Sequence, residues 1–437
     1  MDSFEYRNEE LCAEDVPVSR IARKVGTPAY VYSRATFLDH FRKIDEAFAP
    51  VPHLICYSVK ANSCLAVLAL LKQAGAGFDV VSGGELYRVR KAGGAMDKVV
   101  YAGVGKTDEE LTAALRAGIL LFNIESEAEL ENLNALAGKL RRARRLKAPA
   151  RVALRVNPDV DPHTHSYITT GKKENKFGVD LERAARVLEA ARRLPHIRFA
   201  GLHVHIGSQI TEVEPYRDAL TKVVAFIKAH RSQAAPLDYL DAGGGFGIYY
   251  EDRKAPPIHE FAGVMLPLVR ESGCTLILEP GRFVCGNAGI LLTRVLYVKE
   301  SGAKRFLIVD AGMNDLVRPS LYGAFHEIWP AKHAAKPPTR GGGEAALADA
   351  QPCEVVGPIC ESGDFLARHR ALPKSIRRGD LLAVFSAGAY GHVMSSNYNT
   401  RPRLPEVLVS GKRFAVATRR QTYDDILACE RVPKGIL

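Results

Sequence analysis

LICYSVK, at residues 54–60, is the first of eight short apolar runs, rich in β-branched residues, that follow one another as far as residue 282. The other seven are FDVVSG (78–83), KVVYAG (98–103), LLFNIES (120–126), RVALRVNP (151–158), FAGLHVHIG (199–207), LDYLDAGGG (237–245) and TLILEPGR (275–282). Most of them lack a polar face, which is typical of parallel strands covered on both sides. Segments with helical spacing of apolar residues alternate with the runs, at 111–117, 127–146, 181–194 and 216–230. Eight such units predict an α/β fold with a TIM-like (β/α)8 barrel over residues 35–285.

The chain is too long for this barrel alone, because 437 residues exceed a barrel of ordinary size by enough for a second domain. After residue 282 the pattern changes to strands with turn signals and little helical periodicity, at 289–300, 304–312, 380–388 and 405–411. PAYVYS (28–33) is compatible with a strand of either domain, so the boundary need not be a single cut. We expect residues 1–34 and 286–437 to form an all-β sandwich or barrel.

The sequence also bears on where in the cell the protein is expected. Met1 to Glu10 are acidic and polar, unlike a signal peptide, and no apolar stretch approaches the length of a membrane span. Eight cysteines occur without CxxC pairs, which suggests reduced thiols. We therefore expect a soluble, cytoplasmic protein with no membrane partner.

The net charge of +11 invites a nucleic-acid interpretation, which KLRRARRLK (139–147) supports best. These basic residues end a predicted helix, where they complement the helix C-terminus, and no aromatic stacking surface accompanies them. We expect a solvated face and no nucleic-acid partner. The low-complexity segment at 331–350 is interpreted as a flexible surface insertion.

Lys60, at the end of the first run, is the first candidate for chemistry. An isolated lysine after a strand is usually a surface residue. At the catalytic end of a barrel, however, a partly desolvated lysine can have a lowered pKa and form a Schiff base with an aldehyde. Pyridoxal phosphate supplies such an aldehyde, and it also needs a phosphate cradle, a partner for its ring nitrogen and a group against its ring face.

Each of these needs has a candidate at the end of another run. The glycines at 243–245 offer unobstructed N–H groups for phosphate oxygens, and Ser208 could add a hydroxyl. Glu279 can hold a proton on the ring nitrogen, while Arg282 can bind an anion. His205 could lie flat on the ring. Each piece alone is common, but four complementary groups after the first, sixth, seventh and eighth runs are hard to attribute to chance.

A metal site is the competing interpretation, because HTH (163–165) and HVH (203–205) place histidines two residues apart, as zinc-dependent barrel hydrolases do. Those hydrolases carry their HxH on the first strand and add ligands from later strands. Here the first run ends in Lys60 and the seventh offers mainly glycine. A metal-dependent barrel hydrolase therefore stays a more distant alternative.

The motifs as a set resemble the pyridoxal-phosphate-dependent decarboxylases of fold type III, which have an alanine-racemase-like barrel, and most closely the members that act on meso-diaminopimelate. The resemblance covers nearly the whole chain. It is carried by YSVKAN (57–62), FDVVSGGEL (78–86), HTHSYITTG (163–171), NKFG (175–178), GLHVHIGSQ (201–209), DAGGGFG (241–247), EPGR (279–282), MNDLVRPSLYGAFHEI (313–328) and GPICESGD (357–364). The last of these is the most specific, because related ornithine and arginine decarboxylases differ around its cysteine.

The resemblance implies a role for each matched residue. Residues that would hold the pyridoxal phosphate are Lys60, Asp79, His205, Ser208, Gly243, Gly244, Gly245, Glu279, Gly281, Arg282 and Tyr390. Residues that would bind substrate are Arg282, Arg318, Tyr322, Glu361 and Tyr390. The catalytic residues would be Lys60, His205, Glu279 and Cys360.

The resemblance also implies how Cys360 acts. It would protonate the substrate carbon after carbon dioxide leaves. Its place between a Gly-Pro turn and an acidic pair makes burial less expected than for an ordinary cysteine. Cys360 and Glu361 would enter the site from the partner subunit, which implies a homodimer with two shared active sites that the second domain completes.

Charge favours one substrate. A substrate with an ammonium and a carboxylate at its distal end needs a protein carboxylate such as Glu361 for the ammonium and arginines such as Arg282 and Arg318 for the carboxylate. Ornithine has no distal carboxylate and would leave an arginine without a partner. We expect meso-diaminopimelate to be converted to L-lysine and carbon dioxide, with no metal required. A decarboxylase of another basic amino acid or of a carboxylated polyamine is the alternative. A racemase would need a base opposite Lys60, and GPICESGD argues against it.

Overall fold

The computed structural model describes residues 2–160, 177–190, 193–232, 235–250, 255–333, 349–433 and 435. The chain divides into two compact units. The barrel unit comprises Leu38–Ile248 and Lys254–Val284, and the β unit comprises Met1–Phe37, Tyr249–Arg253 and Cys285–Leu437. The HTH motif, the first half of NKFG and most of the expected insertion at 331–350 lie outside the described residues.

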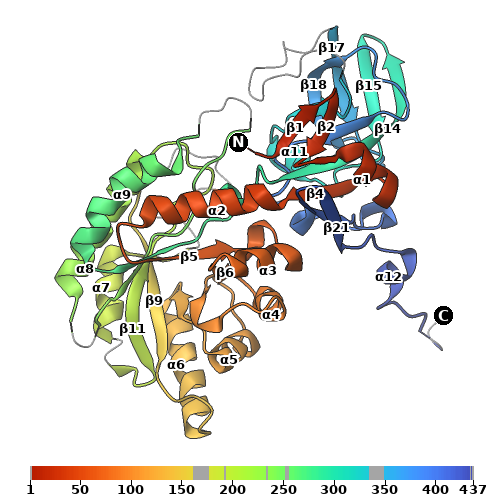
Figure 1. Ribbon diagram of the computed structural model, residues 1–437. Coiled ribbons are helices and arrows are strands. Elements are labelled where there is room, and N and C mark those ends of the chain that lie inside the picture. Colours follow the sequence, from red (N-terminus) through yellow and green to blue (C-terminus); the bar gives the residue numbers. More distant parts are fainter. Residues whose placement is uncertain are drawn as a thin grey trace. The chain divides into compact units, whose positions relative to one another are not determined.

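A closed ring of eight parallel strands forms the centre of the barrel unit (Figure 1). The strands are β5 (His53–Ser58), β6 (Gly77–Val80), β7 (Val99–Tyr101), β8 (Leu121–Ile124), β9 (Ala150–Asn157), β11 (Ile197–His203), β12 (Tyr239–Asp241) and β13 (Thr275–Leu278). The ring closes where β13 pairs with β5, with Leu276 opposite His53. A short strand, β10 (Val179–Asp180), pairs with β9 outside the ring. The predicted (β/α)8 barrel is thereby confirmed.

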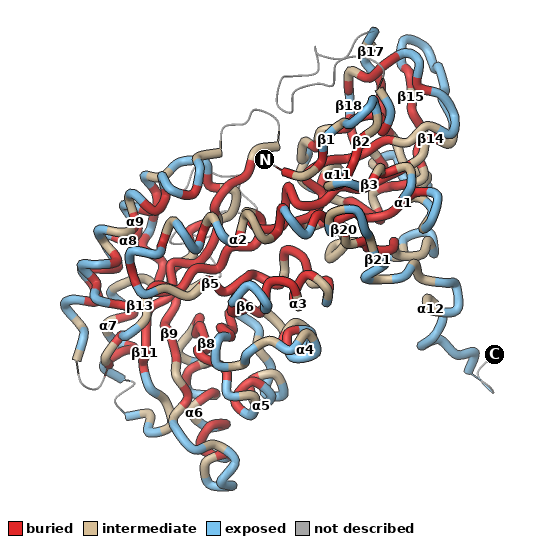
Figure 2. Tube along the Cα trace, viewed as in Figure 1, coloured by how far each residue is buried: buried red, intermediate tan, exposed pale blue. Residues whose placement is uncertain are grey.

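Helices connect the strands and cover the outside of the ring, while the strands themselves are mostly buried (Figure 2). They are α2 (Arg34–Phe48), α3 (Leu65–Gln73), α4 (Gly83–Lys91), α5 (Asp108–Ala117), α6 (Glu127–Arg142), α7 (Leu181–Ala190), α8 (Glu214–His230), α9 (Ile258–Ser272) and α10 (Arg282–Cys285), with 3-10 turns η1 (Val59–Ala61) and η2 (Met96–Lys98). Helix α5 begins in a capping box between Thr107 and Glu110 and ends at Gly118, which adopts a left-handed φ of 70°.

The predicted end of α6 was wrong. The apolar spacing of 127–146 predicts a helix to residue 146, but α6 ends at Arg142. Arg144 adopts a φ of 56°, which is incompatible with continuing the helix. Apolar periodicity does not report such a local backbone reversal, so the basic run at 139–147 is helical only in its first half.

Two sheets build most of the β unit. Strands β1 (Phe4–Arg7), β2 (Glu10–Ala13) and β3 (Val16–Pro17) form one. The other contains β4 (Ala29–Ser33), β14 (Gly289–Ser301), β15 (Lys304–Val309), β16 (Ile328–Pro330), β17 (Ala350–Val356), β18 (Phe365–Pro373), β19 (Leu381–Val384), β20 (Glu406–Ser410) and β21 (Arg413–Thr418). The short helices α1 (Val18–Val25), α11 (Arg318–Tyr322) and α12 (Tyr423–Leu427) and the turns η5 (His392–Met394) and η6 (Tyr398–Thr400) complete it, so the unit is mostly sheet.

The core of the β unit joins residues from distant parts of the sequence. Phe4, Leu11, Val31, Trp329 and Phe385 belong to one cluster of buried side chains. Strand β4 pairs with β14 and β20, so the N-terminal segment is a structural part of this sheet. Burial of these apolar side chains stabilises the pairing between segments that lie far apart in the sequence.

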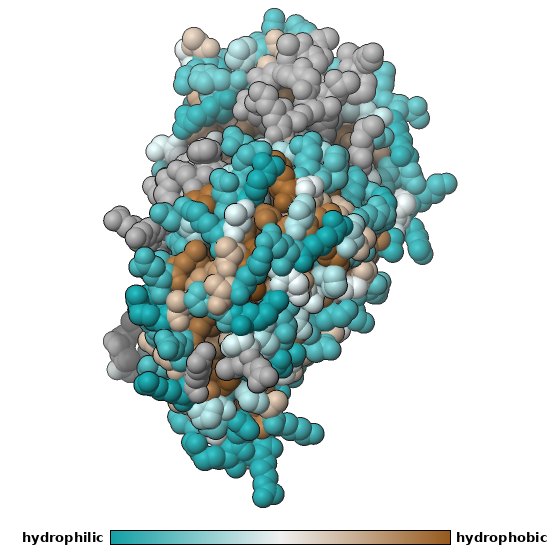
Figure 3. Space-filling view, turned by 90° about the vertical axis from the view of Figure 1, so that its left-hand side faces the viewer, coloured by the Kyte–Doolittle hydropathy of each residue, from teal (hydrophilic) through white to brown (hydrophobic). Residues whose placement is uncertain are grey.

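The surface is mainly polar. The face shown in Figure 3 is mostly hydrophilic, with hydrophobic residues gathered in narrow strips between polar side chains. Within the described part of the chain, no helix combines the length and the apolar character needed to cross a membrane.

Candidate active site

Lys60 lies at the C-terminal end of β5, beside Asp79 of β6. Lys60 Nζ is 2.9 Å from Asp79 Oδ2, which also accepts a hydrogen bond from the Ser58 hydroxyl. Burial raises the pKa of Asp79 and repulsion from Glu279 adds to the rise, whereas Lys60 and Ser58 oppose it. The Lys60 side chain is 34% exposed while the Asp79 side chain is fully buried. The amine is therefore accessible to a small molecule and is held by a buried acid.

A buried pair of carboxyl groups lies at the same ends of the strands. Asn123 of β8 donates from Nδ2 to Asp241 Oδ2 at 3.0 Å and to Glu279 Oε1 at 3.1 Å. His203 Nε2 is 3.4 Å from Glu279 Oε2. Burial raises the pKa of Asp241 well above its usual value, and the neighbouring Glu279 raises it further. Burial also opposes ionisation of Glu279, but His203 and Lys60 bring its pKa below the usual value. The two carboxyl groups are therefore driven in opposite directions, with the pKa of Asp241 raised and the pKa of Glu279 lowered.

His203, Asp241 and Glu279 also have potential metal-ligand atoms within 4.8 Å of one another, the one such group among the described residues. His205 is not a member of this group. Its Nδ1 instead accepts a hydrogen bond from the Gly244 amide at 3.2 Å. The two histidines of HVH therefore serve different partners rather than forming one paired ligand set. Both carboxyl groups already accept hydrogen bonds from Asn123.

His205 follows β11 and packs against the glycine loop that follows β12. Burial lowers the pKa of His205 well below its usual value, and Arg155 and Lys60 lower it further. The imidazole is therefore neutral at neutral pH. Because Nδ1 accepts the Gly244 N–H, the ring proton resides on Nε2.

The glycine loop approaches its neighbours too closely for side chains. A Cβ on Gly244 would lie 2.0 Å from the carbonyl oxygen of Glu279, and a Cβ on Gly245 would lie 2.3 Å from that of Gly207. Gly243 and Gly245 also adopt positive φ angles of 67° and 106°. The loop presents its backbone without side chains, but two of its amides already donate within the protein, Gly243 N to Asp241 Oδ1 at 3.0 Å and Gly244 N to His205 Nδ1 at 3.2 Å.

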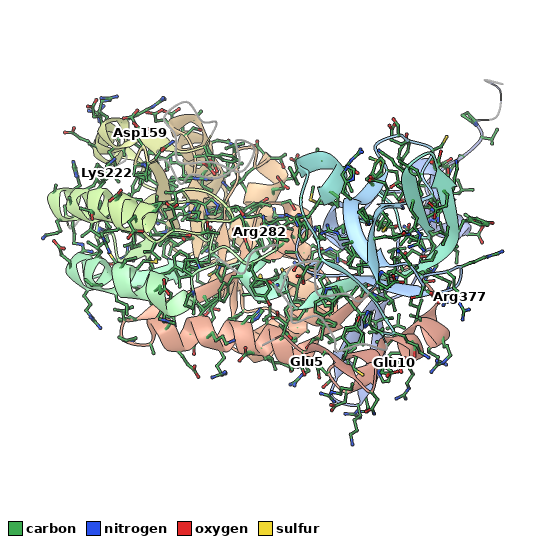
Figure 4. All side chains as sticks on the ribbon, turned by 90° about the horizontal axis from the view of Figure 1, so that it is seen from above. Glu5, Glu10, Asp159, Lys222, Arg282 and Arg377 are labelled. Atoms are coloured by element: carbon green, nitrogen blue, oxygen red, sulfur yellow. The ribbon has the colours of Figure 1, made fainter. Side chains whose placement is uncertain are left out.

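Two further loops meet near the glycine loop. Arg282, labelled in Figure 4, is buried and donates from Nη2 to the Ser208 hydroxyl at 3.2 Å. A Cβ on Gly281 would lie 2.9 Å from Ala61 Cβ, so the EPGR turn packs directly against the turn that carries Lys60. The structure thus brings together, from separate strands, the barrel residues that the sequence suggested.

Arg155 and Glu125 form a buried ion pair to which no motif in the sequence pointed. Arg155 of β9 donates from Nη1 to Glu125 Oε1 at 2.8 Å, and its guanidinium lies 4.5 Å from the centre of the Phe177 ring. The signal was present in the runs LLFNIES and RVALRVNP, where a charged residue interrupts an apolar strand near its C-terminal end. Asn123 and Asp241 could have been found in the same way.

The chain segment after β9 is fastened to α8. Lys222 Nζ donates to the carbonyl oxygens of Pro158 and Asp159 at 2.8 and 3.2 Å, and Lys222 and Asp159 lie side by side in Figure 4. These backbone contacts hold the C-terminal end of β9, and with it Arg155, in place.

Cys360 lies in the β unit, in the loop between β17 and β18. Asp364 accepts hydrogen bonds from Met313 N at 2.6 Å and from Ile359 N at 2.7 Å, and Asn399 Oδ1 accepts from Cys360 N at 2.9 Å. Cys360 is exposed, as its sequence setting suggests, whereas most of the other cysteines are buried, and all eight are free. The thiol is thus presented on a loop that is tied down on both sides.

The other predicted residues of the β unit are arranged as follows. Arg318, the first residue of α11, is buried. Tyr322 at the end of α11 and Tyr390 are half-buried, and Glu361 is exposed. Tyr390 adopts a positive φ of 55°. These residues and Cys360 form the part of the predicted site that belongs to the β unit.

Comparisons with known proteins agree with this geometry. Residues 34–286 match the family described as pyridoxal-dependent decarboxylase, pyridoxal binding domain. A diaminopimelate decarboxylase of Pseudomonas aeruginosa is 47% identical over 98% of this chain and 99% of its own length. The crystal structure of a diaminopimelate decarboxylase from M. jannaschi has a TM-score of 0.90 at 35% identity and covers 100% of this chain and 99% of its own. The crystal structure of a Helicobacter pylori diaminopimelate decarboxylase complexed with L-lysine has a TM-score of 0.86 at 37% identity and covers 94% of this chain and 98% of its own. The chain therefore belongs to the pyridoxal-dependent decarboxylase family, among the diaminopimelate decarboxylases.

Proposed function

We propose that this protein uses pyridoxal phosphate to decarboxylate meso-diaminopimelate, with L-lysine and carbon dioxide as products, the last step of lysine biosynthesis. The observation that carries the proposal is the pairing of an accessible Lys60 with buried Asp79, at the same strand ends as the charged Glu279. Full-length similarity to diaminopimelate decarboxylases supports the choice of substrate.

The barrel residues fit the cofactor. Lys60 would hold its aldehyde, and the glycine loop at 243–245, Ser208, Gly281 and Arg282 would surround its phosphate, with Tyr390 contributing from the β unit. The absence of side chains at 243–245 supports the phosphate assignment, because nothing but backbone borders a bound anion there. When bound, pyridoxal phosphate withdraws the electrons of the bond to the departing carboxylate.

Charges around the site suit this role. The pKa of Glu279 lies below its usual value, so its carboxylate would keep a proton on the ring nitrogen, and the pKa of the neighbouring Asp241 is raised. His205 is neutral and would lie against the ring face. Asp79, which accepts a hydrogen bond from the Lys60 amine at 2.9 Å, would hold that amine whenever it is not attached to the cofactor.

The β unit would complete the site. Cys360 would donate a proton to the α-carbon once carbon dioxide has left, and Glu361 would receive the distal ammonium of the substrate. Arg318, Tyr322 and, from the barrel unit, Arg282 would bind its carboxylates. Cys360 and Glu361 would act in the site of the partner subunit of a homodimer. The eight free thiols support a cytoplasmic location.

Product analysis tests the proposal. The purified protein is incubated with pyridoxal phosphate and, in parallel, with meso-diaminopimelate, L-ornithine, L-arginine or L-lysine, and the amines formed are separated by chromatography. We expect L-lysine from diaminopimelate and no product from the other three. A diamine or polyamine product would overturn the substrate but retain the cofactor chemistry.

Replacement of Lys60 tests the cofactor assignment. Lys60→Ala should lose both the cofactor-linked absorbance and the activity, because the covalent attachment is removed. An exposed lysine with the same substitution, Lys304→Ala, should keep both, since its side chain is 56% exposed and 4.0 Å from its nearest acid. Absorbance and turnover that survive Lys60→Ala would show that another amine carries the cofactor.

A further inference from the structure

We infer that His326 is a positioning residue that aims the guanidinium of Arg318 and so sets the selection for substrates with a distal carboxylate. This inference rests on the proposed function, because it takes Arg318 to bind that carboxylate. His326 has no exposed surface and lies two residues before β16, within the β unit.

The hydrogen bonds of His326 define its tautomer. Arg318 Nη1 lies 3.0 Å from His326 Nε2, and an arginine can only donate, so Nε2 accepts. His326 Nδ1 therefore carries the proton and donates it to the Phe385 carbonyl oxygen at 2.8 Å. The two bonds lie on different nitrogens of one ring, so the imidazole connects Arg318 directly to the backbone.

That backbone is held by the sheet. Ile328 of β16 pairs with Val384 of β19, and Phe385 N donates to Glu327 O at 2.8 Å. Strand pairing therefore fixes the Phe385 carbonyl oxygen beside His326. The register of β16 and β19 determines where the imidazole presents Nε2.

Arg318 needs such an anchor because it begins a helix of only five residues. A long arginine side chain has many rotamers, and restricting them on ligand binding costs conformational entropy. Tyr250 adds a second contact, because the Arg318 guanidinium lies 4.8 Å from the centre of the Tyr250 ring. The Tyr250 ring also meets the His326 ring edge-on, with 5.5 Å between the ring centres. A side chain oriented before the substrate arrives binds a carboxylate more tightly than a mobile one.

Two substitutions separate the two hydrogen bonds of His326. His326→Asn retains a donor near the position of Nδ1 but removes the acceptor for Arg318. His326→Gln retains an acceptor near the position of Nε2 but removes the donor to Phe385. His369→Asn is the matched control, because the His369 side chain is 75% exposed in the same unit and Asn tolerates its positive φ of 50°.

The experiment uses the enzyme loaded with pyridoxal phosphate and compares two inhibitors. L-lysine retains the carboxylate that diaminopimelate keeps after decarboxylation, whereas cadaverine, 1,5-diaminopentane, has none. For His326→Asn we expect KM for diaminopimelate and Ki for L-lysine to rise about tenfold, or about 1.4 kcal/mol. Ki for cadaverine should stay within about twofold and kcat should change less than KM, because the interaction acts mainly on binding. His326→Gln, which keeps the acceptor but loses the bond to Phe385, should raise Ki for L-lysine by less than His326→Asn does, and His369→Asn should match the wild type.

The outcomes separate the two claims. If His326→Asn weakens L-lysine and cadaverine equally, or neither, the inference is overturned. If the Asn variant does not fold, the Gln variant decides, since it lacks the bond to Phe385: a Ki for L-lysine that does not rise relative to the Ki for cadaverine would overturn the inference. A wild-type enzyme that does not decarboxylate diaminopimelate would refute the proposed function instead.

Discussion

Asp315 is a buried acid whose ionisation the folded β unit resists. Burial raises its pKa to about 7, although the Gly312 amide and the cations Arg401 and Arg420 favour the charged form. The unfolded chain releases this proton near the ordinary value of 3.8. Between these two values the unfolded state binds fewer protons than the folded state. The contribution of Asp315 to stability is therefore present below pH 3.8 and is lost as the pH rises toward 7.

Asp315→Asn should remove this pH dependence. Denaturant unfolding measured from pH 4 to 7 should show a slope of stability against pH that differs from the wild type by up to about 1.4 kcal/mol per unit. Asp349→Asn is the control, because the Asp349 side chain is 67% exposed. Parallel pH profiles for Asp315→Asn and the wild type would contradict the assignment.

The Cys360 loop offers a second prediction for single residues. Each oxygen of Asp364 accepts one backbone N–H, and an amide can accept at only one of these positions. Asp364→Asn should lower kcat about tenfold, because losing one of these hydrogen bonds removes about 1.4 kcal/mol of the free energy that holds the Cys360 loop in place. The cofactor absorbance should be retained. The same change made in Cys360→Ala should cost much less, since the positioned thiol is already absent. Full additivity of the two substitutions would show that Asp364 acts on something other than Cys360.

Among the connecting elements, the turn between β12 and α9 is sharply constrained by its neighbours. Gly244→Ala would place a methyl group 2.0 Å from the Glu279 carbonyl oxygen, so β12 and β13 would have to separate at their ends. We expect loss of cofactor binding, measured by absorbance, and a fall in unfolding free energy of about 2 kcal/mol or more. Gly263→Ala in α9 is the control, because a Cβ there meets nothing within 4 Å and should stabilise the helix by up to about 1 kcal/mol. Equal cofactor binding in both variants would refute the cradle.

The elements also show what a sequence can predict. The barrel was predictable because each strand is a short local run and its chemistry lies directly after it, as with Lys60 after β5 and Glu279 after β13. The end of α6 was not, because a positive φ at Arg144 leaves no mark on apolar spacing. Each of Arg155 and Glu125 stands out as a charged residue in its own run, but their pairing joins two strands, so neither run alone reveals the ion pair.

At the scale of the whole molecule, the β unit shows most clearly what local sequence patterns fail to predict. PAYVYS was recognisable as a strand, but its partners β14 and β20 lie more than two hundred residues further along the chain. Such pairing is decided by burial in a shared core, which joins Val31 with Ile290 and Val407. Local patterns cannot specify it, and the sequence accordingly left the assignment of this strand open.

The division of the predicted site residues between two units leads to the last prediction. Lys60 belongs to the barrel unit and Cys360 to the β unit, and the proposed homodimer pairs each Lys60 with the Cys360 of the other subunit. Lys60→Ala and Cys360→Ala should each be nearly inactive alone. If the two variants are dissociated, mixed in equal amounts and reassembled, random pairing makes about half of the dimers mixed, and each mixed dimer has one intact site of two. Activity should then recover to about one quarter of the wild-type value. Each variant taken through the same treatment alone should recover nothing, and a mixture that also stays inactive, although size-exclusion chromatography shows dimers, would mean that Lys60 and Cys360 of the same subunit act together.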